Sequence, residues 1–237
     1  MQSILQNITI RMIPCVGESI GLTQLVFKHL NFFCEPIIRI FCIFGSYFII
    51  MDIIAALYGN PKTVFTLPET ALLLNEQNFV SLSKRLNYYV KTGRLLNLRK
   101  GIYSQPPYNR EELACCIFAP AYISLEYVLQ KAGVVFQFDS RITLVSYLSR
   151  TIEVDRQMYS FRKIKNQTLI NTKGVLRLEN GVNMATPERA FLDLLYLNDD
   201  YFFDNLKPLD RQLIQDLLPA YNSKALIKKV QKQFKND

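Results

Sequence analysis

The sequence is poor in the residues from which metal centres and catalytic triads are usually built. It has one histidine, His29, and its five cysteines include no Cys-x-x-Cys pair. A zinc site would therefore lack ligands, and no Ser/His/Asp set can be assembled. A glycine-rich phosphate-binding loop is absent as well. We therefore expect a protein that is not an enzyme, with no catalytic residues, no metal and no cofactor.

The cysteines do not suggest a disulfide framework. Cys15, Cys34 and Cys42 lie in the first 50 residues, whereas Cys115 and Cys116 are neighbours. An odd number of cysteines without a secretion signal is typical of a reducing compartment, so we expect a cytoplasmic location.

A hydrophobic run long enough to cross a bilayer is also missing. Residues 40–51 form an uncharged, apolar run of 12 residues between Arg39 and Asp52, whereas a membrane-spanning helix needs roughly 20. A signal peptide fits poorly because this run begins about 40 residues into the chain.

Residues 1–50 allow three interpretations. We favour the one in which translation begins at Met51 and the preceding segment lies outside the native fold. In the second, this segment is a buried or interfacial amphipathic extension. In the third, residues 37–58 anchor the protein in a membrane, although Asp52 would then cost roughly 2.5–3.5 kcal/mol near the bilayer centre.

The distribution of charge points to a polyanionic partner. Of the 237 residues, 49% are apolar, which is enough for a folded core of one large or two small domains. The net charge is +8, and residues 77–110 contain seven basic residues and no acidic one. Residues 111–237 are nearly balanced, with 17 basic and 15 acidic residues. A localised basic segment is typical of proteins that bind nucleic acid.

Two helices are predicted at the start of this basic segment, after a first helix over residues 51–57. Thr66 and Glu69 form a capping-box pattern that begins a short helix extending to Leu74. A polar turn separates it from a second helix over residues 79–92, which Gly93 ends by supplying the left-handed position.

A two-stranded ribbon is predicted directly after these helices. Residues 95–98 and 102–103 are apolar or aromatic, and Gly101 permits the hairpin turn between them. Arg99 and Lys100 would then lie at the exposed tip. Two helices followed by such a ribbon are typical of a winged helix-turn-helix, which we assign to residues 51–108.

The second helix is amphipathic. At 100° per residue its core face is expected to contain Phe79, Leu82, Leu86, Tyr89 and Val90. The candidate DNA-binding residues lie on the opposite face, at the C-terminal end of the helix and on the ribbon: Ser81, Lys84, Arg85, Asn87, Tyr88, Lys91, Arg94, Arg99 and Lys100. Lysine contacts phosphate or guanine, asparagine pairs with adenine, and hydroxyl groups bind phosphate oxygens. The alternative is a basic face that only contacts solvent.

Residues 109–237 are predicted to form a mixed α/β domain, so the expected fold class is α+β. Asn109 is expected to cap a helix over residues 110–117, and Ser124 one that extends to Ala132 and ends at Gly133. Antiparallel strands are expected between residues 142 and 165, and short strands at 168–171, 175–178 and 182–185. Asn180-Gly181 is a hairpin signal.

Three helices are expected at the C-terminal end. Thr186 and Pro187 begin a largely buried helix, in which Arg189 and Asp193 are spaced to pair at i,i+4. Helices over residues 208–218 and 223–234 follow. The last one carries several lysines, for which a solvated face is favoured over a second phosphate-contacting surface.

Several of these stretches together resemble the AbiEi family of antitoxins. The helix and ribbon over residues 86–103 resemble its N-terminal winged domain. Tyr122-Ile-Ser-Leu-Glu126 and Ala185-Thr-Pro-Glu-Arg-Ala-Phe-Leu-Asp-Leu-Leu195 resemble its C-terminal domain. The resemblance covers roughly residues 51–197, and residues 1–50 match nothing in the family.

The resemblance implies a type IV toxin–antitoxin module associated with abortive phage infection. The antitoxin would repress its own promoter through the winged domain, on double-stranded DNA with inverted repeats. It would also counteract a nucleotidyltransferase-like toxin without forming a stable complex. By position, the DNA-binding elements would be residues 81–91 and the pair Arg99 and Lys100.

Two other functions remain open at this point. A nuclease targeted by the winged domain would need metal-binding carboxylates such as Glu153 and Asp155, but the lysine expected two residues further on is missing. A protein-interaction module would use the winged fold without binding DNA.

Overall fold

The computed structural model describes residues 38–43, 46–51 and 53–235. The pattern of contacts divides the chain into two units, Met1–Ile50 and Met51–Asp237. Strands β1 (Ile38–Ile43) and β2 (Ser46–Met51) pair in a two-stranded sheet. His29 and most of the predicted apolar extension lie outside the described residues.

Among the residues that the structure describes, none of the helices combines the length and apolar character that a bilayer span requires. The stretch 37–58, considered above as an anchor, instead contains β1, β2 and the six-residue helix α2 (Ile53–Tyr58) in its described part.

The predicted helices and ribbon of the basic segment are present within a few residues of their expected bounds. The elements in chain order are α2, β3 (Val64–Thr66), α3 (Leu67–Leu73), α4 (Phe79–Lys91), β4 (Leu96–Arg99) and β5 (Ile102–Ser104). Strand β3 was not expected from the sequence. It pairs with β5, so the ribbon becomes a three-stranded antiparallel sheet in the order β3–β5–β4.

Local capping explains where these helices begin and end. The Thr66 hydroxyl accepts the Glu69 amide proton at 3.3 Å, and the Glu69 carboxylate accepts the Thr66 amide proton at 2.8 Å, so the predicted capping box is confirmed. Asn78 caps α4 through Ser81. Gly93, with φ +74°, and Gly101, with φ +77°, adopt the left-handed conformation at the helix end and the hairpin turn.

A small hydrophobic core holds α2, α3, α4 and the sheet together. Its buried members are Ile53, Leu57, Phe65, Ala71, Leu82, Leu86, Leu95 and Tyr103. Tyr89 and Val90 pack against this cluster as predicted. Phe79 does not belong to it, because it lies in the first turn of α4 and is 47% exposed. The prediction of its core position was therefore wrong.

A larger mixed sheet with helices on both faces forms the rest of the second unit. Its helices are α5 (Arg110–Ile117), α6 (Glu126–Lys131), α7 (Asn166–Leu169), α8 (Pro187–Leu197), α9 (Arg211–Leu217), the 3-10 helix η1 (Leu218–Tyr221) and α10 (Lys224–Gln233). Its strands are β6 (Ala121–Ile123), β7 (Ile142–Ser146), β8 (Arg150–Val154), β9 (Gln157–Lys163), β10 (Val175–Arg177) and β11 (Asn183–Ala185). The expected α+β class is confirmed.

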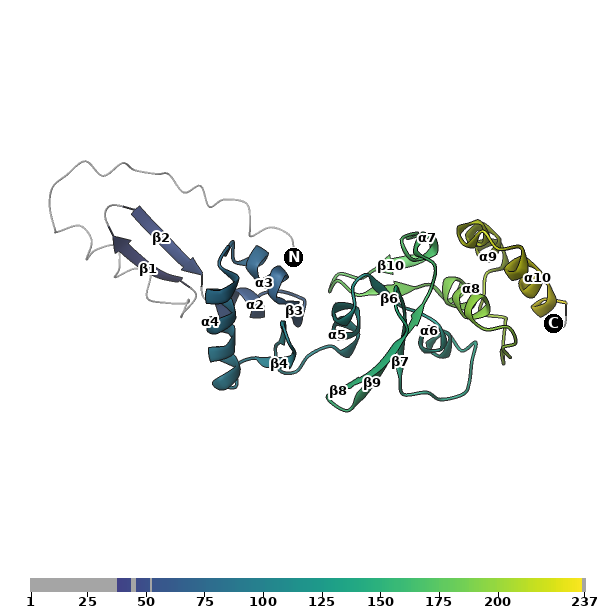
Figure 1. Ribbon diagram of the computed structural model, residues 1–237, viewed down its shortest axis with the longest axis horizontal. Coiled ribbons are helices and arrows are strands. Elements are labelled where there is room, and N and C mark those ends of the chain that lie inside the picture. Colours follow the sequence, from purple (N-terminus) through teal and green to yellow (C-terminus); the bar gives the residue numbers. More distant parts are fainter. Residues whose placement is uncertain (1–37, 44–45, 52, 236–237) are drawn as a thin grey trace, which may run out of the picture. The chain divides into compact units, whose positions relative to one another are not determined.

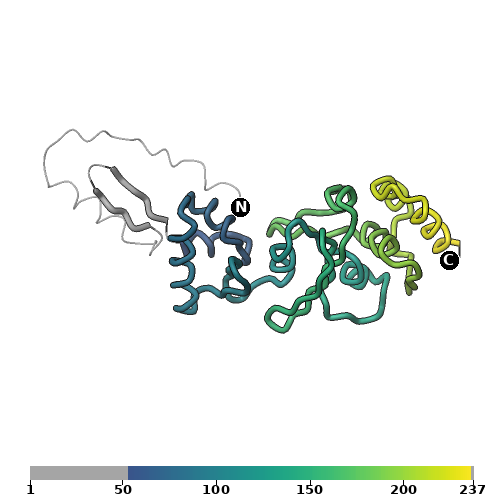
Figure 2. The backbone as a smooth tube through the Cα atoms, in the orientation of Figure 1, coloured from purple at the N-terminus to yellow at the C-terminus, as the bar shows by residue number. Residues whose placement is uncertain are grey.

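The strand order is β10–β11–β6–β7–β9–β8. The β8/β9 and β10/β11 pairs are antiparallel, as predicted. The β7/β9 and β11/β6 pairs are parallel, so the expectation of antiparallel strands alone was incomplete. Helix α5 packs against β6 and β7, whereas α6 and α8 lie on the other side of the sheet (Figure 1). The trace in Figure 2 continues from α8 into α9 and α10, both of which contact α8.

A buried polar network connects two of the three stretches on which the family resemblance rests, residues 122–126 and the helix after Thr186. Asp193 accepts hydrogen bonds from the hydroxyls of Tyr221 at 2.7 Å, Ser124 at 2.7 Å and Tyr122 at 3.0 Å. The Arg189 guanidinium lies 3.4 Å from Asp193, which confirms the predicted pair, and both side chains are fully buried. Burial raises the pKa of Asp193, an effect that the Arg189 cation opposes.

This network overturns two local predictions. Ser124 was expected to cap a helix, but its hydroxyl donates to Asp193, and α6 begins after Leu125 without a side-chain cap. Residues 168–171 were expected to form a strand, but the chain turns into α7 there. The Thr168 carbonyl accepts a hydrogen bond from Arg189 at 2.8 Å, so a long-range contact outweighs the local β preference.

Glu112 connects the segment before β3 to the larger sheet. Its side chain is 2% exposed, and one carboxylate oxygen accepts the Thr63 amide at 2.6 Å, the Thr63 hydroxyl at 2.8 Å and the Val64 amide at 2.9 Å. The other oxygen accepts the Asn180 amide group at 3.1 Å. Val64 and Ile102 also belong to the larger hydrophobic cluster. The predicted domain boundary at residue 108 stays a prediction.

We expect Glu112→Ala to lower the free energy of unfolding by about 3 kcal/mol, because buried donors on Thr63, Val64 and Asn180 lose their acceptor. Urea denaturation would measure the change as a lower midpoint with an unchanged slope. Glu153→Ala is the matched control, since this glutamate is exposed on β8, and its effect should stay within about 0.5 kcal/mol. Equal effects of the two changes would contradict the role of Glu112.

Candidate functional site

The exposed face of α4 gathers four of the predicted DNA-binding residues. Lys84, Asn87, Tyr88 and Lys91 line a shallow surface hollow of about 550 Å³ together with Val90. Leu82 and Leu86 bury the opposite face and so fix which side of α4 is presented to solvent. Lys84 and Lys91 form no ion pair with any described residue. Their charges are therefore available to an external anion.

Asn87 and Tyr88 are positioned by aromatic neighbours. The buried Tyr103 hydroxyl donates a hydrogen bond to the Asn87 side-chain oxygen at 3.4 Å, and the Asn87 amide nitrogen forms no hydrogen bond with a described residue. Tyr88 is 62% exposed, and its ring meets Tyr89 edge to face at 5.5 Å. Both exposed side chains are thus positioned by contacts with more buried tyrosines.

Ser81 and Arg85 are less available than the sequence suggested. Arg85 forms an ion pair with Glu76 at 3.3 Å, and the same carboxylate accepts the Asn78 amide at 3.0 Å. Ser81 lies in the first turn of α4 and is only half-exposed. Glu76 is the acidic residue directly before the acid-free stretch 77–110. It was therefore the nearest candidate partner for Arg85 that the sequence offered.

The two cations of the predicted hairpin tip have different environments. Lys100 is exposed beside Gly101. Arg99 is half-buried, with its guanidinium carbon 4.9 Å from the centre of the Phe118 ring. Leu98 packs against the larger hydrophobic cluster as well. The expected exposure of both cations was therefore wrong for Arg99, whose contact with Phe118 no local pattern could have revealed.

Arg94 lies just beyond the C-terminal end of α4. Its backbone carbonyl accepts a hydrogen bond from the Tyr58 hydroxyl at 2.9 Å, and its side chain is exposed. Before β3, Lys62 forms an ion pair with Glu69 of α3 at 2.5 Å. Desolvation acts to raise the pKa of Glu69, but hydrogen bonds from Lys62 and Thr66 outweigh it, and the pKa is lowered. The Glu69 carboxylate of the capping box is therefore favoured in its ionised form, bound to Lys62 and Thr66.

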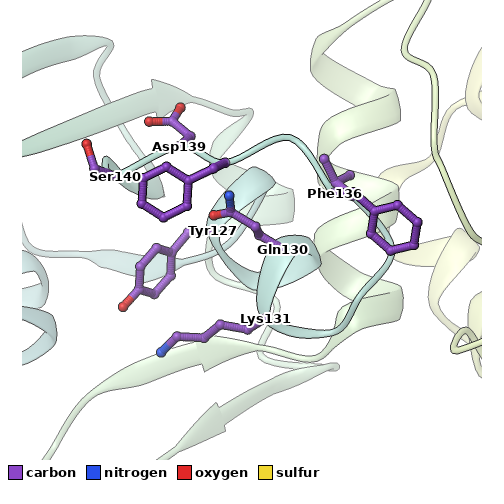
Figure 3. A pocket seen from close by; sticks show the side chains of 8 residues that line it. Tyr127, Gln130, Lys131, Phe136, Asp139 and Ser140 are labelled. Atoms are coloured by element: carbon purple, nitrogen blue, oxygen red, sulfur yellow. The ribbon is translucent and has the colours of Figure 1, made fainter.

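A second surface hollow, of about 600 Å³, lies beside α6 (Figure 3). Figure 3 shows the Tyr127 hydroxyl and the Lys131 ammonium on one side of α6 and Phe136 on the other. Tyr127 and Lys131 both donate to Glu111, and Asp139 in the same hollow pairs with Arg141 at 2.6 Å. Its charged groups are thus already matched within the chain.

The carboxylates considered for a nuclease do not converge. Glu153 is exposed on β8, and Asp155 accepts a hydrogen bond from the Tyr108 hydroxyl at 2.8 Å. Burial and the contact with Asp155 raise the pKa of Tyr108 to about 12. In the described part of the chain, no three His, Cys, Asp or Glu side chains lie close enough together to hold a metal ion.

Comparisons with protein-family models and with curated proteins found no match to this chain.

We expect Arg99→Ala to lower the free energy of unfolding by about 1 kcal/mol, because the guanidinium–ring contact with Phe118 is lost. Arg94→Ala removes an exposed arginine that lies close by in sequence, and its effect should stay within about 0.5 kcal/mol. Urea denaturation of both variants measures the difference. If Arg94→Ala destabilised the protein as much, the stacking on Phe118 would contribute nothing specific.

Proposed function

We propose that residues 51–108 contain a winged helix-turn-helix that binds double-stranded DNA. In this proposal α3 and α4 are the two helices, α4 enters the major groove, and the β4–β5 hairpin is the wing. The observation that carries the proposal is the face of α4 on which Lys84, Asn87, Tyr88 and Lys91 are exposed together. The other face of the helix is held in the core by Leu82 and Leu86.

The chemistry of this face suits a nucleic acid more than a protein. Lys84 and Lys91 lie two helical turns apart, about 10 Å along the axis, so they can contact separate phosphates. Asn87 lies between them and is the one side chain of this group that can pair with adenine in the major groove. Tyr88 offers a hydroxyl to the phosphate backbone. Two lysines without ion pairs, one on either side of an amide, therefore suit contacts with the backbone and the bases of a duplex.

The contacts of Arg99 and Arg85 refine the proposal. Arg99 would anchor the base of the wing through Phe118, and Lys100 would be the wing residue that reaches the DNA backbone. Arg85 would contribute less, because Glu76 already neutralises part of its charge. The principal contacts in this proposal are therefore Lys84, Asn87, Lys91 and Lys100.

We further propose that the protein is an autorepressor and antitoxin of the AbiEi type. The support is the resemblance of residues 86–103, 122–126 and 185–195 to that family. Within the fold, Tyr122, Ser124, Arg189 and Asp193 are buried together. Their part in an antitoxin would be to stabilise the C-terminal region, and the antitoxic surface would lie elsewhere on it.

Binding to a duplex from the region upstream of its own coding sequence should weaken steeply with salt. Each phosphate contact contributes about 0.9 to the slope of log K against log salt concentration. The double change Lys84→Ala/Lys91→Ala should therefore lower affinity and reduce this slope by about 2. Fluorescence anisotropy at several salt concentrations would measure both.

The matched control for this experiment is Lys224→Ala/Lys228→Ala, which removes two exposed lysines from another amphipathic surface helix, α10. It should leave affinity and slope nearly unchanged. A salt-independent affinity of the wild type, or equal losses in the two double variants, would contradict recognition by α4.

The antitoxin proposal predicts that growth inhibition by a nucleotidyltransferase-like protein encoded next to this gene is relieved when the two are co-expressed. Lys84→Ala/Lys91→Ala should still relieve the inhibition but should no longer repress a reporter driven by the upstream region, because the resemblance places antitoxicity in the C-terminal part. Colony counts and reporter activity measure the two effects. Failure of the wild type to relieve the inhibition would rule out antitoxicity, and failure of the variant alone would contradict the separation of functions.

A further inference from the structure

A cavity of about 520 Å³ lies at the β10 edge of the larger sheet. Its walls come from α5, the start of β6, the segment after α7, and the β10–β11 hairpin. The lining includes Cys115, Pro120, Tyr122, Val175, Arg177 and Asn183. Several segments that are distant in sequence thus enclose a volume within the range of small-molecule sites.

The cavity is mainly apolar, with one uncompensated cation. Ala121, Leu169 and Val175 contribute aliphatic surface, and the Cys115 thiol donates to the Asn183 carbonyl at 3.7 Å. Arg177 is exposed on the edge strand β10 and forms no ion pair with a described residue. The hollow beside α6 differs in this respect, because its Lys131 and Asp139 already have partners of opposite charge.

An apolar wall with a single free guanidinium selects one class of ligand. A planar carboxylate or a sulfonate accepts two parallel hydrogen bonds from arginine, and an attached apolar group would be removed from water by the aliphatic wall. Among the described residues, no carboxylate lines the cavity, so none of them offers a counter-charge to a cationic ligand.

We propose that this cavity binds a small organic anion with an apolar body, and that Arg177 holds the anionic group. The site is separate from the exposed face of α4, and its occupation does not depend on whether the protein binds DNA.

The aryl sulfonate 1-anilinonaphthalene-8-sulfonate is a direct probe, because its fluorescence rises on transfer to an apolar site. A titration of the full-length protein should saturate at one site. Arg177→Gln should weaken this binding at least about tenfold, the expected effect of losing a charge-assisted hydrogen bond. Arg150→Gln is the matched control, because Arg150 is also exposed on an edge strand, β8, at the opposite edge of the same sheet.

Cysteine alkylation supplies a second measurement that needs no variant. Burial raises the pKa of Cys115 to about 11 and that of Cys116 to about 12, so both react slowly. Cys115 lines the cavity and its neighbour Cys116 does not. Peptide mapping after treatment with N-ethylmaleimide should show that the bound probe slows modification of Cys115 but leaves Cys116 unchanged.

Three outcomes would overturn the proposal. The first is equal affinity of the wild type and Arg177→Gln for the probe. The second is the absence of protection of Cys115. The third is loss of the fluorescence signal in Phe138→Ala, because Phe138 is exposed in the hollow beside α6 and its loss should matter only if the probe binds there.

Discussion

The buried pair of Arg189 and Asp193 is the constraint on which the larger part of the fold depends. Two charges removed from water are costly unless every remaining donor and acceptor is satisfied. Here the hydroxyls of Tyr122, Ser124 and Tyr221 donate to Asp193, and Arg189 donates to the carbonyls of Thr168 and Lys173. The Arg189 Nε lies 3.4 Å from Asp193 and is the one nitrogen of the guanidinium group that forms no hydrogen bond with a described residue. Helix α8 thereby fixes β6, the end of α7 and η1 at once. Tyr122, which this network holds, also lines the cavity at the β10 edge of the sheet.

Glu112 and Arg99 connect the three-stranded sheet to the larger sheet and its helices. Glu112 accepts hydrogen bonds from the backbone before and at the start of β3, and Arg99 stacks on Phe118 at the end of α5. Both contacts join the three-stranded sheet to residues that follow it in sequence. Lys84 and Lys91 on α4 remain exposed to solvent. The proposed DNA-binding face is therefore supported by Glu112, Phe118 and Arg99, of which only Arg99 carries a basic charge.

Much of the secondary structure was predictable because its causes are local. The caps at Thr66, Asn109 and Thr186 and the turns at Gly101 and Gly181 depend on residues within a few positions, and all are present. Ser124 shows where such reasoning fails. Its cap pattern resembles that of Thr186, but its hydroxyl bonds Asp193, 69 residues away. The strand expected at 168–171 failed for the same reason, since Arg189 recruits the carbonyl of Thr168.

The sequence by itself determined that α4 is amphipathic, that its outer face is basic, and that a hairpin follows, because helical period, local charge and glycine position are properties of neighbouring residues. Only the tertiary structure decided which cations remain free. Arg85 is paired with Glu76, Arg99 lies over the Phe118 ring, and Lys84 and Lys91 form no ion pair with a described residue. The cavity that Arg177 lines is likewise formed by segments that are distant in sequence. Pairing and enclosure depend on distances through space, which residue spacing along the chain does not specify.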